Sequence, residues 1–315
     1  MISLFLILQL AYGHANPRLT LSLFADTADT TDIAQISAQK FIQTASQQTV
    51  SIELKPGIQR GISVEQGRSD LILMPLHRLA RQIPELAVLE LPFFYSDIHQ
   101  LHKQLDGKLG KYLKQQAYQR GWQILAWWDE GMQVFSGNRR YNERINLTGM
   151  EFILLRDDPM AELQFKSFNA WSRRVSAESS QQLLKECAVG SRSASLQRIW
   201  AERLDRVHLS VSLSRHRYEG WVLAAPLSGW QKLPEIQRQQ LQQAAIQMQN
   251  WQRQQASHRE QVALDKLKQN NMQIYELTPE KRQQFIQRLP AWPDLLPVSL
   301  SPETKQILLT TAAGT

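Results

Sequence analysis

Two histidines are the best candidates for metal chemistry in this 315-residue chain. His208 and His216 could share a metal ion if carboxylates lay beside them. The nearest acids, Asp205 and Glu219, each lie three residues from a histidine, an odd spacing that a strand places on opposite faces. We therefore expect two structural histidines and no metal site.

Two adjacent aspartates, Asp157 and Asp158, could supply a carboxylate pair for general acid and base catalysis. Neighbouring carboxylates before a proline, here Pro159, more often cap a loop. The sequence also lacks a glycine-rich phosphate loop, a G-x-S-x-G turn and an H-E-x-x-H helix motif. These observations argue against an enzyme and predict no cofactor.

The charge balance is basic, with 36 Lys and Arg against 29 Asp and Glu and a net charge of +7. Nucleic acid is thus a partner to consider, but the basic residues are scattered in pairs such as Arg139-Arg140. Diffuse charge favours solubility, so we expect no nucleic-acid partner. The single cysteine, Cys187, excludes an intrachain disulfide and a cysteine-based zinc cluster.

The N-terminal stretch "SLFLILQLAYGHA" has an apolar core of about ten residues, followed by small residues at Gly13 and Ala15. This pattern predicts a signal peptide over residues 1–15 and export to the periplasm. The alternative is a buried first strand or helix. The run is shorter than the roughly 20 residues that span a bilayer.

The pattern after the signal is β-α-β-α-β. "RLTLSLF" and "TVSIELKP" alternate like strands, a helix lies between them, and "LILMP" is typical of a strand buried on both faces. We expect an α/β lobe. Pro92 should carry the apolar run "VLEL" out of the sheet, and a helix should begin near Asp97.

A second region follows the strand "WQILAWW", which reaches Asp129-Glu130-Gly131. Its predicted elements are the strand "EFILLR", helices over residues 179–186 and 195–203, and the strands "VHLSVSL" and "WVLAA". Pro234 is well placed to open a long helix with an apolar stripe.

Several stretches together, in this order, resemble the periplasmic solute-binding subunits of tripartite ATP-independent periplasmic (TRAP) transporters, of the C4-dicarboxylate-binding type. They are "GRSD", "LILMP", Pro84-Glu85, "VLELPFF", "LDGKLG", "GWQILAWWDEG", "NLTGMEF", "LSRHRYEG", "WQKLP" and "LKQNNMQIYELTPEKRQQF". The likeness covers most of the chain after the signal. No single motif is specific, but the ordered set is.

The resemblance implies a type II-like periplasmic binding protein fold: two α/β lobes, joined by crossing strands and by a long helix that touches both. We expect lobe I from residues 16–130 plus about 220–257, lobe II from 131–219 plus about 258–305, and a C-terminal tail over 306–315. The implied function is capture of a small organic solute between the lobes and delivery to TRAP membrane subunits by a monomer. The alternative is a periplasmic sensor or interaction module that kept the fold and lost uptake.

The resemblance also points to ligand-binding positions at which this chain departs from the family. Ile153 stands where most members have a carboxylate-binding arginine, and Gln133 stands where a second arginine is usual. In "AVGSRS" the family's two acids become Val189 and Arg192, and its asparagine becomes Ser193. The chain is therefore divergent in its pocket.

These departures predict a pocket less suited to acids. Arg156 could replace the lost charge, although strand alternation turns it away from Ile153. Trp128, with its neighbour Trp127 and with Gln133, suggests an aromatic wall and a neutral solute, unless the tryptophans only pack the lobe. On this interpretation, Ile153→Arg should restore affinity for carboxylates.

Overall fold

The computed structural model describes residues 19–25, 32–46, 50–56, 71–155, 157–176, 179–180, 182–183, 186 and 190–314. The predicted signal peptide lies outside these residues, as does most of the helix expected over 179–186. Among the helices that are described, none combines the length and the apolar character that a membrane span requires.

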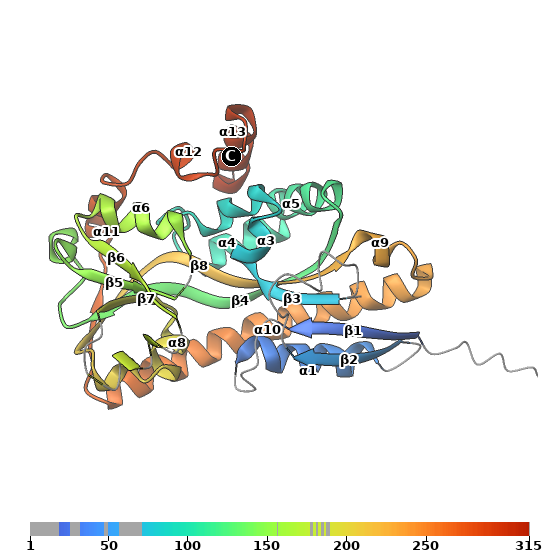
Figure 1. Cartoon of the computed structure of the whole chain (residues 1–315), viewed down its shortest axis with the longest axis horizontal. Coiled ribbons are helices and arrows are strands. Elements are labelled where there is room, and N and C mark those ends of the chain that lie inside the picture. Colours follow the sequence, from blue (N-terminus) through green and yellow to red (C-terminus); the bar gives the residue numbers. More distant parts are fainter. Residues whose placement is uncertain are drawn as a thin grey trace, which may run out of the picture.

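Nine described strands form one mixed sheet in the order β2-β1-β3-β8-β4-β7-β5-β6, with β9 added beside β8 (Figure 1). The strands are β1 (Leu19–Ala25), β2 (Val50–Pro56), β3 (Leu71–Pro75), β4 (Trp122–Gly137), β5 (Glu151–Leu154), β6 (Trp171–Arg174), β7 (Ser191–Ala194), β8 (Ser210–Pro226) and β9 (Gln273–Glu276). The three parallel strands at one end, β2, β1 and β3, are those predicted from apolar periodicity.

The two long antiparallel strands β4 and β8 cross the whole molecule. The sequence predicted a shorter strand before Asp129 and two separate strands within β8. Both strands instead run on through their polar middle sections, because each supplies hydrogen-bond partners to the other there. Register shifts, one of them between Asp129 and Gly131, bend β4 where it passes the centre.

Four apolar clusters show that this sheet serves two lobes. Two clusters cover the two faces at the β1–β3 end and include Leu86 and Phe41. Two more cover the faces at the β5–β7 end and include Phe152 and Ile199. The predicted two-lobed α/β fold is confirmed, with β4 and β8 as the shared connections.

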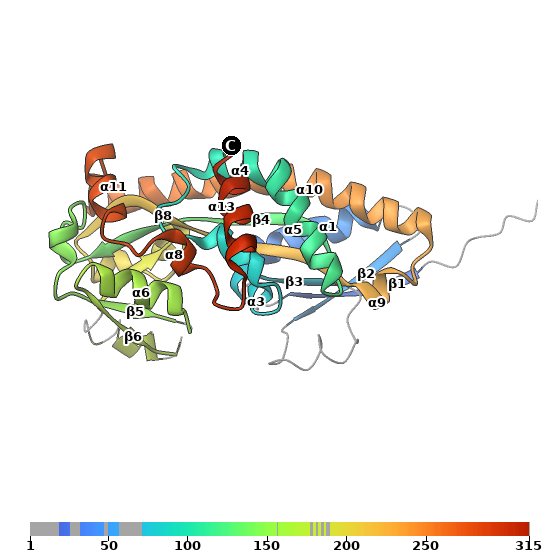
Figure 2. The ribbon, with the colours of Figure 1, turned by 90° about the horizontal axis from the view of Figure 1, so that it is seen from above.

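The long helix α10 (Glu235–Gln269) runs beneath both lobes (Figures 1 and 2). It contacts α1 (Ile33–Ala45) in lobe I and α8 (Leu196–Ala201) in lobe II. Its interior is rich in Gln, Ala and Leu and has no Gly or Pro, which favours a continuous helix. The predicted helix after Pro234 that touches both lobes is thus confirmed.

The remaining helices lie on the faces of the sheet or at its ends. They are α3 (Leu76–Ala80), α4 (Ile98–Asp106), α5 (Lys108–Gln119), α6 (Pro159–Ser167), α9 (Leu227–Trp230), α11 (Pro279–Ile286), α12 (Trp292–Leu295) and α13 (Pro302–Ala313), with short 3-10 turns η1 (Pro84–Glu90), η2 (Arg144–Leu147) and η3 (Leu204–Arg206).

Two expectations from the sequence need correction. The apolar run before Pro92 is the 3-10 turn η1, not a sheet strand, and it begins with Pro84, whose fixed φ suits a first helical position. The C-terminal residues are helical and join lobe I, because Leu295, Leu300 and Leu308 are buried in its core. Figure 2 shows α13 lying across α5.

Candidate functional site

A cavity of about 320 Å³ lies between the two lobes. Lobe I contributes β3 and α3, and lobe II contributes β5, β7 and α6, while β4 and β8 form the floor. The described lining residues are Asp32, Pro75, His77, Arg78, Gln133, Ile153, Leu154, Leu155, Asp158, Ala161, Arg192, Ser193, Ala194, Arg198, Arg217, Glu219, Gly220 and Trp221.

Three of the five site residues proposed from the sequence meet in this cavity: Gln133, Ile153 and Ser193. Ser193 Oγ lies 3.0 Å from Gln133 Oε1. Trp128 lies elsewhere, fully buried in a lobe I core cluster, so it packs the lobe and forms no wall of the cavity. Arg156 is outside the described residues.

A chain of hydrogen bonds reaches the cavity from the core of lobe II. His216 is stacked on Phe135 and lies 2.9 Å from Ser193 Oγ and 2.7 Å from Ser214 Oγ. Burial, together with nearby Arg217, lowers the pKa of His216 well below its ordinary value, so the ring is neutral. This histidine therefore orients Ser193.

Arg217 is held in the cavity by two buried acids. Its Nη2 donates to Asp158 Oδ2 at 2.8 Å and lies 3.7 Å from Glu90 Oε1. Burial alone would lower the pKa of Arg217, but Asp158 and Glu90 raise it, so it stays charged. Asp158 also caps α6 by accepting from Ala161 N, as its position before Pro159 suggested.

Two further arginines line the opposite wall. Arg192 Nη2 lies 2.8 Å from Glu202. Burial lowers the pKa of Arg192, although the negative charge of Glu202 acts to raise it. Arg198 Nη2 lies 3.2 Å from Glu130 Oε1, and this contact raises the pKa of Arg198. Both guanidinium groups are thus fixed in place by acids behind the cavity wall, while each has five donors in all.

Sequence reasoning missed most of the charged groups of the cavity; Arg192 and Asp158 are the two that it had named, Arg192 as a departure from the family and Asp158 as a possible catalytic carboxylate. The described lining holds four arginines against three carboxylates. Arg217 and Glu219 stand two apart in β8 and so share a face, a signal that was present in "RHRYEG". Arg198 and Arg78 gave no such signal, because only the tertiary fold brings α8 and α3 to the cavity.

No group of three or more His, Cys, Asp or Glu side chains in the described part of the chain could hold a metal ion. His208 is a buried structural residue, with Nε2 3.1 Å from Gly190 O and Nδ1 3.0 Å from Ser136 Oγ. His208 and His216 thus have different hydrogen-bond partners and do not form a shared site.

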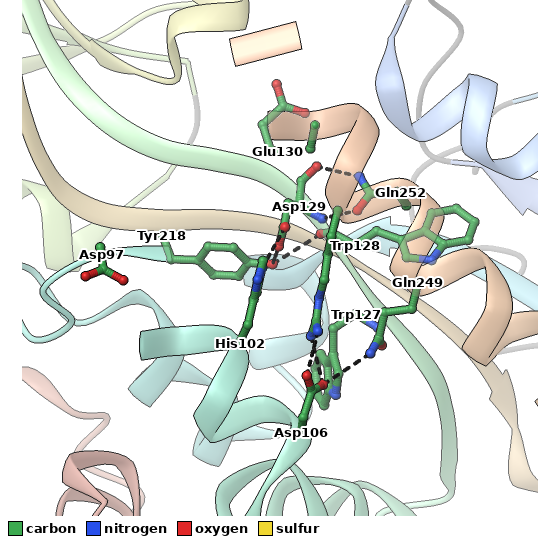
Figure 3. A network of polar contacts seen from close by, with 12 residues as sticks. Asp97, His102, Asp106, Trp127, Trp128, Asp129, Glu130, Tyr218, Gln249 and Gln252 are labelled. Carbon is green, nitrogen blue, oxygen red and sulfur yellow. Dashed lines mark hydrogen bonds and ion pairs between the residues drawn. The ribbon is translucent and has the colours of Figure 1, made fainter. Parts of the chain in front are cut away.

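A polar network behind the cavity fixes the middle of β4 (Figure 3). The Asp129 carboxylate lies 2.7 Å from His102 Nε2 and accepts from Tyr218 Oη at 2.9 Å. Gln252 on α10 accepts from Asp129 N at 2.8 Å and donates to Asp129 O at 2.7 Å. The crossing strand is therefore anchored to α4, β8 and α10 at a single residue.

Next to this anchor, Gly131 adopts a φ of 130°, which side-chain-bearing residues rarely adopt. This backbone lies where β4 passes from one lobe to the other. Glu130, between the anchor and the glycine, is 4% exposed. Burial raises the pKa of Glu130 to about 7, although Arg198 opposes the change.

Comparison with known proteins places the whole chain in context. The protein is similar to the C4-dicarboxylate-binding protein DctB of Bacillus subtilis (strain 168), with 24% identity over 265 residues that cover 81% of this chain and 75% of DctB.

Two solved TRAP periplasmic solute-binding proteins share the fold. One is from Ochrobactrum anthropi and has its C-terminus bound in the ligand-binding pocket. It has a TM-score of 0.85 and 20% sequence identity, and the alignment covers 95% of this chain and 96% of the Ochrobactrum chain. The other is from Sulfurospirillum deleyianum and has bound succinate. It has a TM-score of 0.77 and 20% sequence identity, and the alignment covers 94% of this chain and 99% of the Sulfurospirillum chain.

The family model that describes bacterial extracellular solute-binding proteins of family 7 matches residues 33–293. This range includes most of both lobes, the crossing strands and every described lining residue of the cavity except Asp32. The chain therefore belongs to family 7 of the bacterial extracellular solute-binding proteins.

Proposed function

We propose that this protein captures a small organic acid in the cavity between its lobes and delivers it to the membrane subunits of a TRAP transporter. The observation that carries the proposal is the set of four arginines that line the cavity, Arg78, Arg192, Arg198 and Arg217. Guanidinium groups are favoured donors to carboxylates. Arg192, Arg198 and Arg217 are held in place by Glu202, Glu130 and Asp158, respectively. The activity proposed is binding, in keeping with a family described as solute-binding proteins.

This proposal replaces the neutral, aromatic solute expected from the sequence. That expectation depended on Ile153 and Gln133 replacing arginines, and on tryptophans forming a wall. The structure has other arginines around the same cavity, and Trp127 and Trp128 lie in core clusters. The alternative of a sensor that lost uptake depended on the same absence of arginines. The four arginines of the lining remove that reason for the alternative.

The size of the cavity supports a compact solute. About 320 Å³ is at the lower end of the range of small-molecule pockets. Gln133, Ser193 and Glu219 add neutral and acidic hydrogen-bonding groups beside the arginines, which suits an acid that also has hydroxyl groups. Relatives whose names or structures refer to C4-dicarboxylates and succinate are consistent with this size and charge.

Paired solutes that differ only in the acid group test the proposal. Thermal unfolding of the protein should be measured with D-glucuronate and with D-glucose, which lacks the carboxylate, and also with succinate and orotate. A binder at 100 times its Kd stabilises the fold by about 2.7 kcal/mol. We expect stabilisation by at least one acid and none by glucose. Stabilisation by none of the three acids, whether or not glucose stabilises the protein, would overturn the proposal.

We further propose that the protein acts in the periplasm as a monomer, after removal of residues 1–15. The apolar stretch before Gly13 and Ala15 supports export, and the family is extracellular by description. N-terminal sequencing of the protein from the periplasmic fraction should give a chain that begins near Asn16, and size-exclusion chromatography should give one copy. An intact Met1 on the protein would contradict the export proposal.

A further inference from the structure

Glu130 on the crossing strand β4 contacts both lobe II and the second crossing strand, β8. From lobe II, Arg198 Nη2 lies 3.2 Å from Glu130 Oε1, and Ser195 Oγ lies 3.4 Å from the same oxygen. From β8, Trp221 Nε1 donates to Glu130 Oε2 at 3.1 Å. The Glu130 side chain is only 6% exposed, so these contacts take the place of water. Figure 3 shows it beside the Asp129 anchor.

Several other charged groups face Glu130 from the elements packed on it. Asp32 before α1 and Glu219 on β8 are carboxylates that raise its pKa. Glu260 on α10 lies beside Gly131, and Asp129 is its neighbour in β4. Arg198 on α8 favours the ionised form of Glu130, and Arg192 on β7 is the next cation along that wall. These four acids and one directly paired arginine leave the ionised form of Glu130 poorly compensated.

Arg198 has two roles that compete. It pairs with Glu130 behind the wall, and it also lines the solute cavity. A solute carboxylate that reaches Arg198 places a second negative charge on the same guanidinium group, close to Glu130. Since like charges at short range disfavour ionisation, the carboxyl group of Glu130 then binds a proton more strongly than in the empty protein.

We propose that capture of a carboxylate solute at Arg198 is coupled to the uptake of one proton by Glu130. This inference depends on the proposed function, because it requires an acidic solute. In balanced form, the solute enters as an anion, one proton from water binds to a Glu130 carboxylate oxygen, and Arg198 transfers its hydrogen bond from Glu130 to the solute. The proton balances one negative charge of the solute, so the net charge of the site is unchanged for a monoanion such as D-glucuronate and falls by one for the dianion succinate.

The coupling has a defined direction. Burial gives Glu130 a pKa of about 7 in the empty protein, and the solute raises it further. Affinity is then highest below pH 7 and falls as the pH rises above it. Over the interval between the two pKa values the Kd increases up to about tenfold per pH unit, since one proton is bound with the solute.

Calorimetry of the intact protein tests the inference. Succinate, D-glucuronate and orotate are titrated in phosphate and in Tris at pH 7.5, because these buffers release different heats when they give up a proton. We expect an uptake of up to about 0.8 proton per solute bound, because a group with a pKa of about 7 already has its proton in about a quarter of the molecules at pH 7.5. The Kd should rise with pH between 7 and 8. Glu130→Gln should abolish both effects, since the amide retains an oxygen for Trp221 and cannot titrate.

A matched control is Glu85→Gln. Glu85 is a buried glutamate paired with Arg120 Nη2 at 2.6 Å, and it does not line the cavity. This variant should keep the proton uptake of the wild type. If Glu130→Gln fails to fold, the proton count of the wild type still decides the matter.

The outcomes separate the two proposals. Binding of an acid with no proton uptake and no dependence of Kd on pH overturns the coupling alone. Proton uptake that persists in a folded Glu130→Gln protein also overturns it. Failure of all three acids to bind overturns the proposed function, and the coupling with it.

Discussion

Ser193 Oγ lies between Gln133 Oε1, at 3.0 Å, and His216 Nε2, at 2.9 Å. The Ser193 hydroxyl donates its one hydrogen to Gln133. His216 Nε2–H is therefore the donor to Ser193, and in the neutral ring Nδ1 accepts from Ser214 Oγ. Gln133 Nε2 in turn lies 3.3 Å from Glu219 Oε2. The two cavity residues thus form one unit, whose orientation is set from the core of lobe II.

Ser193→Ala should destabilise the protein because it leaves the buried His216 N–H without an acceptor. The expected loss is about 1 to 3 kcal/mol of unfolding free energy. Urea denaturation measures it. Ser167→Ala is the matched control, since the Ser167 hydroxyl is exposed and bonds only to Leu163 O. Equal stability losses for the two variants would contradict the hydrogen-bond chain.

Asp158→Asn should be far more costly than Asp157→Asn. The first change removes the close anion from Arg217, whose side chain is 3% exposed, while an asparagine can still cap α6. Breaking a buried ion pair costs about 3 to 5 kcal/mol, with Glu90 reducing the loss.

Asp157 pairs with Arg174 at 3.1 Å on the surface, with both side chains more than half exposed. Such pairs contribute about 0 to 1 kcal/mol. Equilibrium unfolding of both variants checks the contrast. A loss of more than about 2 kcal/mol for Asp157→Asn would show that the surface pair matters more than its exposure implies.

Much of the fold could be predicted from apolar periodicity and from the ordered resemblance. The strand at Leu71–Pro75 and the helix after Pro234 follow from such patterns. The length of β8 could not be predicted, because the polar section "SRHRYEG" has no apolar signal. Arg217 stays in the strand because it pairs with Asp158, and Glu219 stays because it accepts from Gln133 on β4. Both partners are brought there by the tertiary fold.

The site was harder to predict than the fold. Gln133, Ile153 and Ser193 could be proposed because they lie on strands whose place in the fold follows from the resemblance. Trp128 could not be assigned, since alternate residues of β4 face opposite core clusters and the choice depends on the register past the centre. Arg198 comes from a short helix, and nothing in the local sequence links it to Glu130.

Ile153→Arg should lower stability and should not restore affinity for acids, contrary to the expectation from the sequence alone. Ile153 is 1% exposed and pairs in register with Arg192 on β7. A second guanidinium group there would be buried beside a like charge. We expect a loss of more than about 2 kcal/mol of unfolding free energy.

Ile153→Leu is the control for this change, as a volume-conserving substitution costs less than about 1.5 kcal/mol. Thermal unfolding with and without succinate reports both stability and binding. A stable Ile153→Arg protein that binds succinate more tightly than the wild type does would restore the original interpretation of this position.

His208 should make the protein less stable in mild acid. Burial lowers the pKa of His208 to about 4, so the folded protein resists a proton that the unfolded chain accepts near pH 6.5. The stability that depends on the neutral ring is complete above pH 6.5 and is lost as the pH falls toward 4. Linkage gives a loss of about 3 kcal/mol over that interval.

Unfolding free energies of wild type and His208→Gln from pH 7 to 4 measure this contribution by their difference. The variant should have the shallower dependence on pH. His258→Gln, at an exposed position of α10, should retain the wild-type slope. A His208→Gln curve parallel to that of the wild type would assign the acid sensitivity to other groups.

Gln252→Ala should release the crossing strand from the long helix. Gln252 is fully buried and holds both the N–H and the C=O of Asp129, so its loss leaves two backbone groups of β4 unpaired in the core. Each unsatisfied group costs about 1 to 3 kcal/mol.

Gln254→Ala changes the same residue type two positions on, where the side chain is exposed, and should cost less than about 0.5 kcal/mol. Hydrogen exchange adds a local measurement, since the Asp129 amide should exchange faster in Gln252→Ala than in Gln254→Ala. Unchanged protection of that amide would show that β4 is held at the centre by its pairing with β8 alone.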